Sequence, residues 1–132
     1  MQKRFFIILL SAFFLGCSQG ATRVSIEGTV TLDGKPVDNA VVTIRPEAGP
    51  GAGTKTDANG NFSIPKNEGP MAGNAQIMVE KFNIVEEKSG DGKIDEVLVP
   101  ALPPDIQVKP KPYVIQKGKN KIDIKLEEWR NK

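Results

Sequence analysis

Few side chains in this sequence could perform covalent or acid–base chemistry. The chain contains no histidine, and Cys17 is its single cysteine. Catalysis by a Ser–His or Cys–His pair is therefore excluded, as is a zinc site built from histidine and cysteine. The remaining candidates are pairs of adjacent acids: Glu86-Glu87, Asp95-Glu96 and Glu127-Glu128. Adjacent side chains on a strand point to opposite faces, so we expect no acid–base pair, no enzymatic activity and no cofactor.

Two segments have a spacing similar to that of a calcium-binding loop, but each lacks an essential position. The first covers residues 57–68 and has Phe62 where the loop requires glycine. The second covers residues 87–98 and has Leu98 where a bidentate glutamate is required. Both segments are rich in residues that favour turns, and we expect turns without a metal site.

The C-terminal part of the chain is basic and carries two candidate aromatic platforms. Its lysines are Lys109, Lys111, Lys117, Lys119, Lys121 and Lys125. Such a surface suits anionic lipid or an acidic polysaccharide, whereas lysines also keep exposed edge strands from pairing with other chains. Trp129 and Tyr113 are the side chains on which a sugar would stack.

The N-terminus has the pattern of a secretory signal. A short cationic segment, residues 1–4, precedes eleven apolar or small residues, 5–15. That run is too short to cross a bilayer, and it matches the charged and apolar regions of a signal peptide. The segment Phe14-Leu15-Gly16-Cys17 resembles the bacterial lipobox, whose cysteine receives a diacylglycerol. We expect a helical signal peptide over residues 1–16, a lipid on Cys17 and a tether over residues 17–23; a secreted protein with a spare thiol is the alternative.

The formal net charge of +2 comes entirely from the expected signal segment. Residues 1–16 contain Lys3, Arg4 and no acid, so the remaining 116 residues hold 16 basic and 16 acidic side chains. A neutral domain of this kind has no general field that attracts nucleic acid. Its length suits one domain.

Period-two alternation of apolar residues predicts β-strands through the rest of the chain. The clearest strands place Val24, Ile26, Val30 and Leu32 on one face at the start, and Ile122, Ile124 and Leu126 on one face at the end. Asp33-Gly34 predicts a hairpin turn, with Ala40, Val42 and Ile44 on the returning strand. Phe62 and Ile64 form a further apolar face, and the prolines of residues 100–112 exclude helix there.

The apolar pattern of residues 75–84 is compatible with two arrangements of the strand. Ala75, Ile77 and Val79 share a face, whereas Phe82 and Ile84 have the opposite parity. A bulge near Glu80-Lys81 would turn both sets inward; otherwise the strand changes partners at that point. A polar turn follows at residues 89–93.

Three segments carry a family resemblance: residues 24–37, 39–44 and 56–64, with the phrases G-T-V-T-L-D-G-K-P-V and T-D-A-N-G-N-F. They resemble the carboxypeptidase regulatory-like domain, which implies a seven-stranded, transthyretin-like Greek-key sandwich without catalytic residues. We expect this all-β sandwich over residues 24–128, followed by a tail over residues 129–132. About seven short strands separated by turns agree with a sandwich.

These observations predict a non-catalytic lipoprotein of the bacterial envelope. It is exported and held at the cell membrane or outer membrane by the lipid on Cys17, and it binds or holds an envelope protein or polysaccharide. The alternative function is a carbohydrate-binding module of the cell envelope, in which Trp129 or Tyr113 stacks on the sugar.

Overall fold

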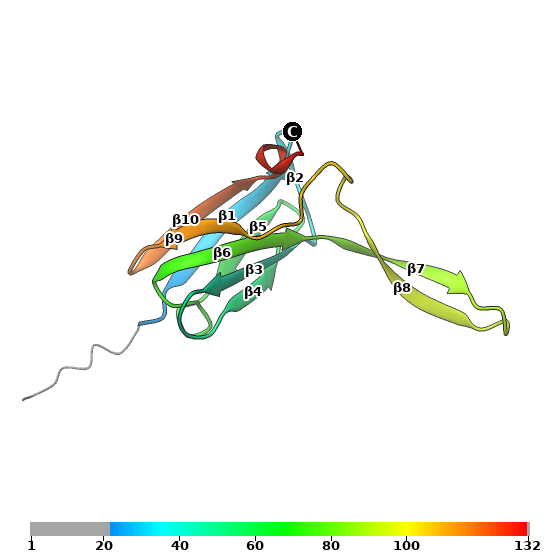
Figure 1. The fold of residues 1–132 in the computed structure, drawn as a ribbon, viewed down its shortest axis with the longest axis horizontal. Helices are drawn as coiled ribbons and strands as arrows, with labels where there is room; N and C mark the ends of the chain where they lie inside the picture. The colour runs from blue at the N-terminus through cyan, green and yellow to red at the C-terminus, as the bar shows by residue number, and fades with distance from the viewer. Residues whose placement is uncertain (1–21, 132) are drawn as a thin grey trace, which may run out of the picture.

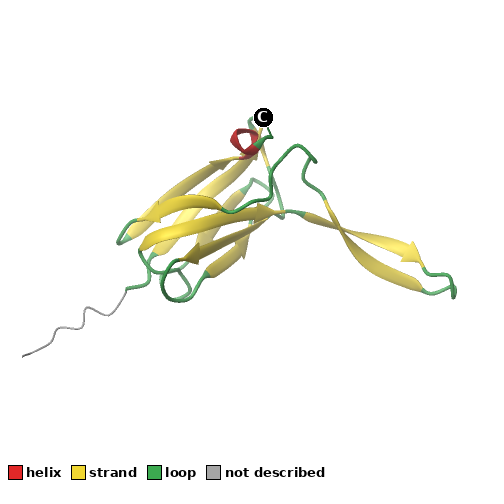
Figure 2. Ribbon diagram, viewed as in Figure 1, coloured by secondary structure: helices red, strands yellow, loops and turns green. Residues whose placement is uncertain are grey.

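The computed structural model describes residues 22–131. The expected signal peptide, Cys17 and most of the tether lie outside the described residues. The described chain forms two packed β-sheets and one long hairpin that projects from them (Figures 1 and 2). Its one helix is a short 3-10 segment, η1 (Leu126–Trp129). The prediction of an all-β sandwich is confirmed. No helix within residues 22–131 has the length and apolarity needed to span a membrane.

The first sheet is built around β1 (Ser25–Leu32). On one side β1 pairs in parallel with β10 (Lys119–Lys125). On the other side it pairs antiparallel with β5 (Asn61–Ile64) and with the two-residue β2 (Lys35–Pro36). The first and last strands of the domain are therefore neighbours in one sheet.

The second sheet is antiparallel throughout. Its order is β4 (Ala52–Lys55), β3 (Val41–Pro46), β6 (Gly73–Glu80) and β9 (Lys111–Ile115). The predicted turn at Asp33-Gly34 is confirmed: φ is 51° and 78° at these residues, as a two-residue hairpin turn requires. The prediction that residues 40–44 return beside β1 is wrong. Only β2 returns, and the chain then crosses to the second sheet, where it forms β3.

The apolar faces predicted from alternation meet between the two sheets. The buried residues that were expected are Val24, Ile26, Val30, Ala40, Val42, Ile44, Phe62, Ile64, Ala75, Ile77, Val79, Ile122, Ile124 and Leu126. Leu32 is only partly buried and packs against this cluster. Thr56 is buried as well, and its hydroxyl donates to the carbonyl of Val37 and accepts from the amide of Ala40. Within the described residues, no buried side-chain polar atom lacks a hydrogen-bond partner.

The end of the chain differs from the expected tail. Trp129 belongs to the buried core, together with Ile106 and Ile115. The amide of Asn131 donates to the carbonyl of Asp105 at 2.8 Å. The packed part of the domain therefore continues beyond residue 128, because the final residues fasten the loop that precedes β9.

At Lys81 the chain leaves the second sheet. β7 (Phe82–Lys88) and β8 (Ile94–Pro100) pair only with each other among the described strands. The bulge that would turn Phe82 and Ile84 into the core is absent, since Ile84 is 66% exposed. The alternative, a change of strand partners at this point, is confirmed.

Candidate functional site

The β7–β8 hairpin, residues 82–100, is here called the arm. Seven residue pairs join its strands, from Phe82 opposite Pro100 to Lys88 opposite Ile94. The predicted polar turn closes it: the Ser89 amide donates to the Lys93 carbonyl at 2.8 Å. A strand of seven residues spans about 23 Å. The arm therefore extends well beyond the sandwich, as Figure 1 shows.

The arm carries an unusual amount of exposed apolar surface. Its exposed apolar side chains are Ile84, Val85, Ile94, Val97, Leu98 and Val99. Ile84 and Leu98 lie opposite each other and are 66% and 65% exposed. Val85 and Val97 form the next pair, on the other face of the ribbon. Exposed apolar side chains gathered on one element in this way are typical of an interaction site.

Between Ile94, next to the turn, and the other exposed apolar side chains, the arm is acidic. Glu86 lies opposite Glu96, and Glu87 lies opposite Asp95. Like charges directly opposite each other destabilise a strand pair. As expected, the adjacent acids of the arm lie on opposite faces, but the hairpin brings acids together across the strands. The symmetric placement of these acids around the turn at residues 89–93 was the signal in the sequence that could have predicted this. Glu127-Glu128 lies in the 3-10 segment η1 and not on a strand as expected.

The base of the arm is fixed to the sandwich by polar contacts. The Lys81 ammonium lies 2.8 Å from the Asp38 carboxylate, and its hydrogen bond and charge hold the pKa of Asp38 below its usual value. The Ala101 amide donates to the Lys81 carbonyl at 2.8 Å. Beside this base is an apolar hollow of about 220 Å³, lined by Glu80, Lys81, Phe82, Pro100, Leu102, Pro103, Pro104, Ile106 and Val108.

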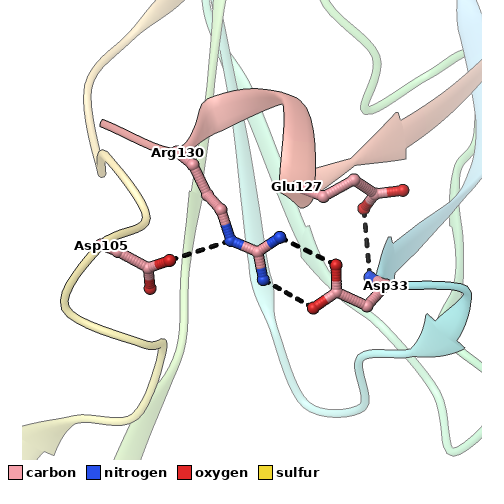
Figure 3. Close-up of polar contacts among 4 residues, drawn as sticks. All are labelled: Asp33, Asp105, Glu127 and Arg130. Carbon is pink, nitrogen blue, oxygen red and sulfur yellow. Dashed lines mark hydrogen bonds and ion pairs between the residues drawn. The ribbon is translucent and has the colours of Figure 1, made fainter. Parts of the chain in front are cut away.

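A cluster of charges fastens the loop that leaves the arm (Figure 3). Arg130 donates two hydrogen bonds to the carboxylate of Asp33, at 2.9 and 2.6 Å, and one to Asp105 at 2.8 Å. The Asp33 amide donates to Glu127 at 3.2 Å. We call these four residues the clasp. The clasp joins three segments that are distant in the sequence, and its hydrogen bonds from Arg130 hold the pKa of Asp33 below its ordinary 3.8.

We expect the stability provided by the clasp to depend on pH in the acid range. The lowered pKa of Asp33 means that its ionised form is stabilised by folding. That contribution is complete well above pH 3.8 and is lost as the pH falls through the lower, folded-state pKa. Urea melts should therefore separate wild type from Arg130→Met by a constant gap between pH 5 and 7. The gap should narrow below pH 3.8, and a gap that widens there would contradict the role of Asp33.

The family of the chain follows from comparison with known proteins. A family model of the carboxypeptidase regulatory-like domain matches residues 25–95, more than half of the chain. The chain belongs to this family. Carboxypeptidase regulatory-like domains are non-catalytic regulatory modules with a transthyretin-like sandwich fold. The matched part ends within β8, so the arm lies at its boundary.

Other comparisons add nothing on function. No curated protein sequence matches this carboxypeptidase regulatory-like chain. Among solved structures, a 9R-lipoxygenase from Cyanothece PCC8801 is similar at a TM-score of 0.40 and 13% sequence identity. The similarity covers 78% of this chain but only 16% of the lipoxygenase chain. Likeness at this level supports no conclusion about activity.

The two aromatic residues considered for sugar stacking, Trp129 and Tyr113, differ in their exposure to solvent in this regulatory-like domain. Trp129 is only 9% exposed, and the Lys111 ammonium lies 5.9 Å from the centre of its ring. The expectation that a sugar could stack on Trp129 is therefore wrong, because the ring is buried. Tyr113 is exposed and lines an open hollow of about 740 Å³ with Arg45 and Gln76. One aromatic ring on an open surface is a weak basis for sugar binding.

In the two loops that resemble calcium sites, the carboxylates of Asp57 and Asp91 already form contacts within the loop. Asp57 accepts from the amides of Asn59 and Asn61, both at 2.9 Å, and forms the expected turn. In the second loop the Lys93 ammonium lies 3.1 Å from Asp91, where it would repel a cation. Residues 22–131 contain no group of three or more acidic, histidine or cysteine side chains arranged to hold a metal ion.

Proposed function

We propose that this chain is a membrane-anchored, non-catalytic envelope lipoprotein that presents the arm to a protein partner. The arm carries the proposal, because it gathers exposed apolar side chains on a ribbon that no third strand of the described part of the chain joins. A two-stranded ribbon is marginally stable alone and gains stability when another surface covers it. The chain has no histidine for acid–base catalysis. The loop acids Asp57 and Asp91 are held by contacts within their own turns, which also favours a role in binding over catalysis.

The placement of the arm suits a protein held at a membrane. The described chain begins at the end of the sandwich that is remote from the arm (Figure 1). The tether of residues 17–23 spans at most about 20–25 Å. A lipid on Cys17 would therefore hold the sandwich close to the membrane and leave the arm pointing away from it.

Photo-crosslinking tests the binding role of the arm. A photoreactive amino acid placed at Ile84 of the full chain, expressed in its own cells, should form a covalent adduct with a partner on illumination. The matched control is the same amino acid at Ser63, which is exposed on β5 of the sandwich. Adducts of equal yield at both positions, or none at Ile84, would refute the proposal.

Substitution of the expected lipid site tests the anchor separately. Cys17→Ser removes the thiol that carries the diacylglycerol, so labelling with an alkyne fatty acid should disappear and the protein should leave the membrane fraction. The anchor is strong because each buried methylene contributes about 0.8 kcal/mol and two chains suffice for stable attachment. Ser18→Ala is the matched control and should keep its label. Equal labelling of wild type and Cys17→Ser would rule out this anchor.

A further inference from the structure

We propose that the partner of the arm is a second copy of this chain, and that the arm docks on the edge formed by residues 108–125. These residues include β9, β10 and the turn between them, and we call this surface the basic edge. The inference rests on the proposed function of the arm as an interaction surface. It goes further by naming the partner and the surface that receives the arm.

Exposed apolar side chains point to this pairing. Among residues 22–131, the large apolar side chains that are exposed lie in only two regions. Six are on the arm, and the other three are Val108, Tyr113 and Val114 on the basic edge. Docking one region on the other would cover both with a single contact. Soluble monomers rarely leave larger apolar patches uncovered.

The charges of the two regions are opposite. The arm contains five acidic residues and two lysines, a formal net charge of −3. Residues 109–125 contain six lysines and one acid, a formal net charge of +5. Lysines from a second copy would neutralise the facing acids Glu86–Glu96 and Glu87–Asp95. Two arms would repel each other, so the charges favour arm against edge and disfavour arm against arm.

The backbone of both regions is open to pairing. Within residues 22–131, β10 and β9 are the outer strands of their sheets, so each has a side on which no described strand pairs. Both arm strands have such a side as well. Addition of a strand to an open edge is a common mode of protein recognition, in which backbone hydrogen bonds add to side-chain contacts. A third strand would also provide the stability that a lone hairpin lacks.

The geometry requires that the contact is made between two molecules. The arm projects away from the sandwich and from its own β9 and β10 (Figure 1). The arm of each copy is then free for the edge of the next, which is a head-to-tail arrangement. Such contacts produce rings or open filaments. The tether of residues 17–23, at most about 20–25 Å long, allows neighbouring anchored copies to sit at different heights.

The test uses full-length chains with two different tags, expressed together in cells. One copy carries a photoreactive amino acid at Leu98, and the other is unmodified. Illumination should give a product that contains both tags, with the crosslink mapped to residues 108–125 of the unmodified copy. The same amino acid at Lys55, which is exposed on β4 at the opposite edge of the second sheet from β9, should give no such product.

Charge exchange provides the second measurement. Lys117→Glu with Lys119→Glu in the receiving copy should lower the yield of that product by about tenfold, since opposed like charges cost more than 1.4 kcal/mol. Glu86→Lys with Glu96→Lys in the arm of the first copy should restore it. If the exchange restores the yield of the two-tag product, the Lys117→Glu, Lys119→Glu copy must be folded. If the yield is not restored, the proposed contact between the arm and the basic edge is overturned.

The outcomes separate the two proposals. Adducts from Leu98 only with a different protein would overturn the self-association and leave the arm as an interaction surface. A crosslink between two arms would also overturn the inference. Absence of any adduct from both Leu98 and Ile84 would overturn the inference and the proposed function together.

Discussion

Phe62→Ala is expected to remove about 3–5 kcal/mol of stability, the usual cost of truncating a buried phenylalanine. Phe62 is 4% exposed and lies opposite Gly28 in the pairing of β1 with β5. A Cβ atom at Gly28 would lie 2.9 Å from the tip of the ring, so the ring occupies the space that the glycine leaves. The loss is a large part of the roughly 5–15 kcal/mol that stabilises a domain.

Urea melts of residues 18–132 measure this effect. Ser63→Ala is the matched control, because Ser63 follows Phe62 on the same strand and faces solvent. It should change the free energy of unfolding by less than about 0.5 kcal/mol. Equal stability of the two variants would mean that the faces of β5 are assigned wrongly.

Trp129→Ala should produce a loss of similar size, about 3–5 kcal/mol. Trp129 packs in the core, and Lys111 covers its ring at a distance typical of a cation–π contact. Its carbonyl also accepts a hydrogen bond from the Gln107 amide at 2.8 Å. Truncation would open the core and loosen the loop between the arm and β9. If Trp129 lay in a free C-terminal tail, its truncation would leave the free energy of unfolding almost unchanged.

Tyr113→Ala is the control for Trp129→Ala. Tyr113 is another C-terminal aromatic residue, but it is 38% exposed and lies outside the core cluster. Its truncation should cost about 1 kcal/mol or less, since surface substitutions are usually mild. If both variants unfold at the wild-type urea concentration, the packing described for Trp129 is incorrect.

The sequence predicts most of the sandwich because its strands obey period-two alternation. Val24, Ile26 and Val30 are buried as expected, and so are Ile122 and Ile124. Alternation identifies the inward face of a strand, but it does not identify the sheet to which the strand belongs. The crossing from β2 to β3 was missed for that reason, since a hairpin return and a change of sheet have the same apolar pattern.

The candidate site was harder to predict for a different physical reason. Ile84 and Leu98 have the alternation of core residues, and a sequence pattern does not show whether the covering surface belongs to the same chain. The clasp was missed because Arg130 meets Asp33 across 97 positions of sequence. A 3-10 segment of four residues also has too few positions to show periodicity. Only the folded arrangement brings these groups together.

The parallel pairing of β1 with β10 has a consequence for how the chain is made. Thr29 and Asp123 are partners in this pairing although 94 positions separate them. The ribosome makes β1 well before β10, so the first sheet stays incomplete until β10 has been made. Contacts of such long range also slow folding after release. If the chain is exported as we propose, this delay would leave it more time to reach the secretion channel unfolded.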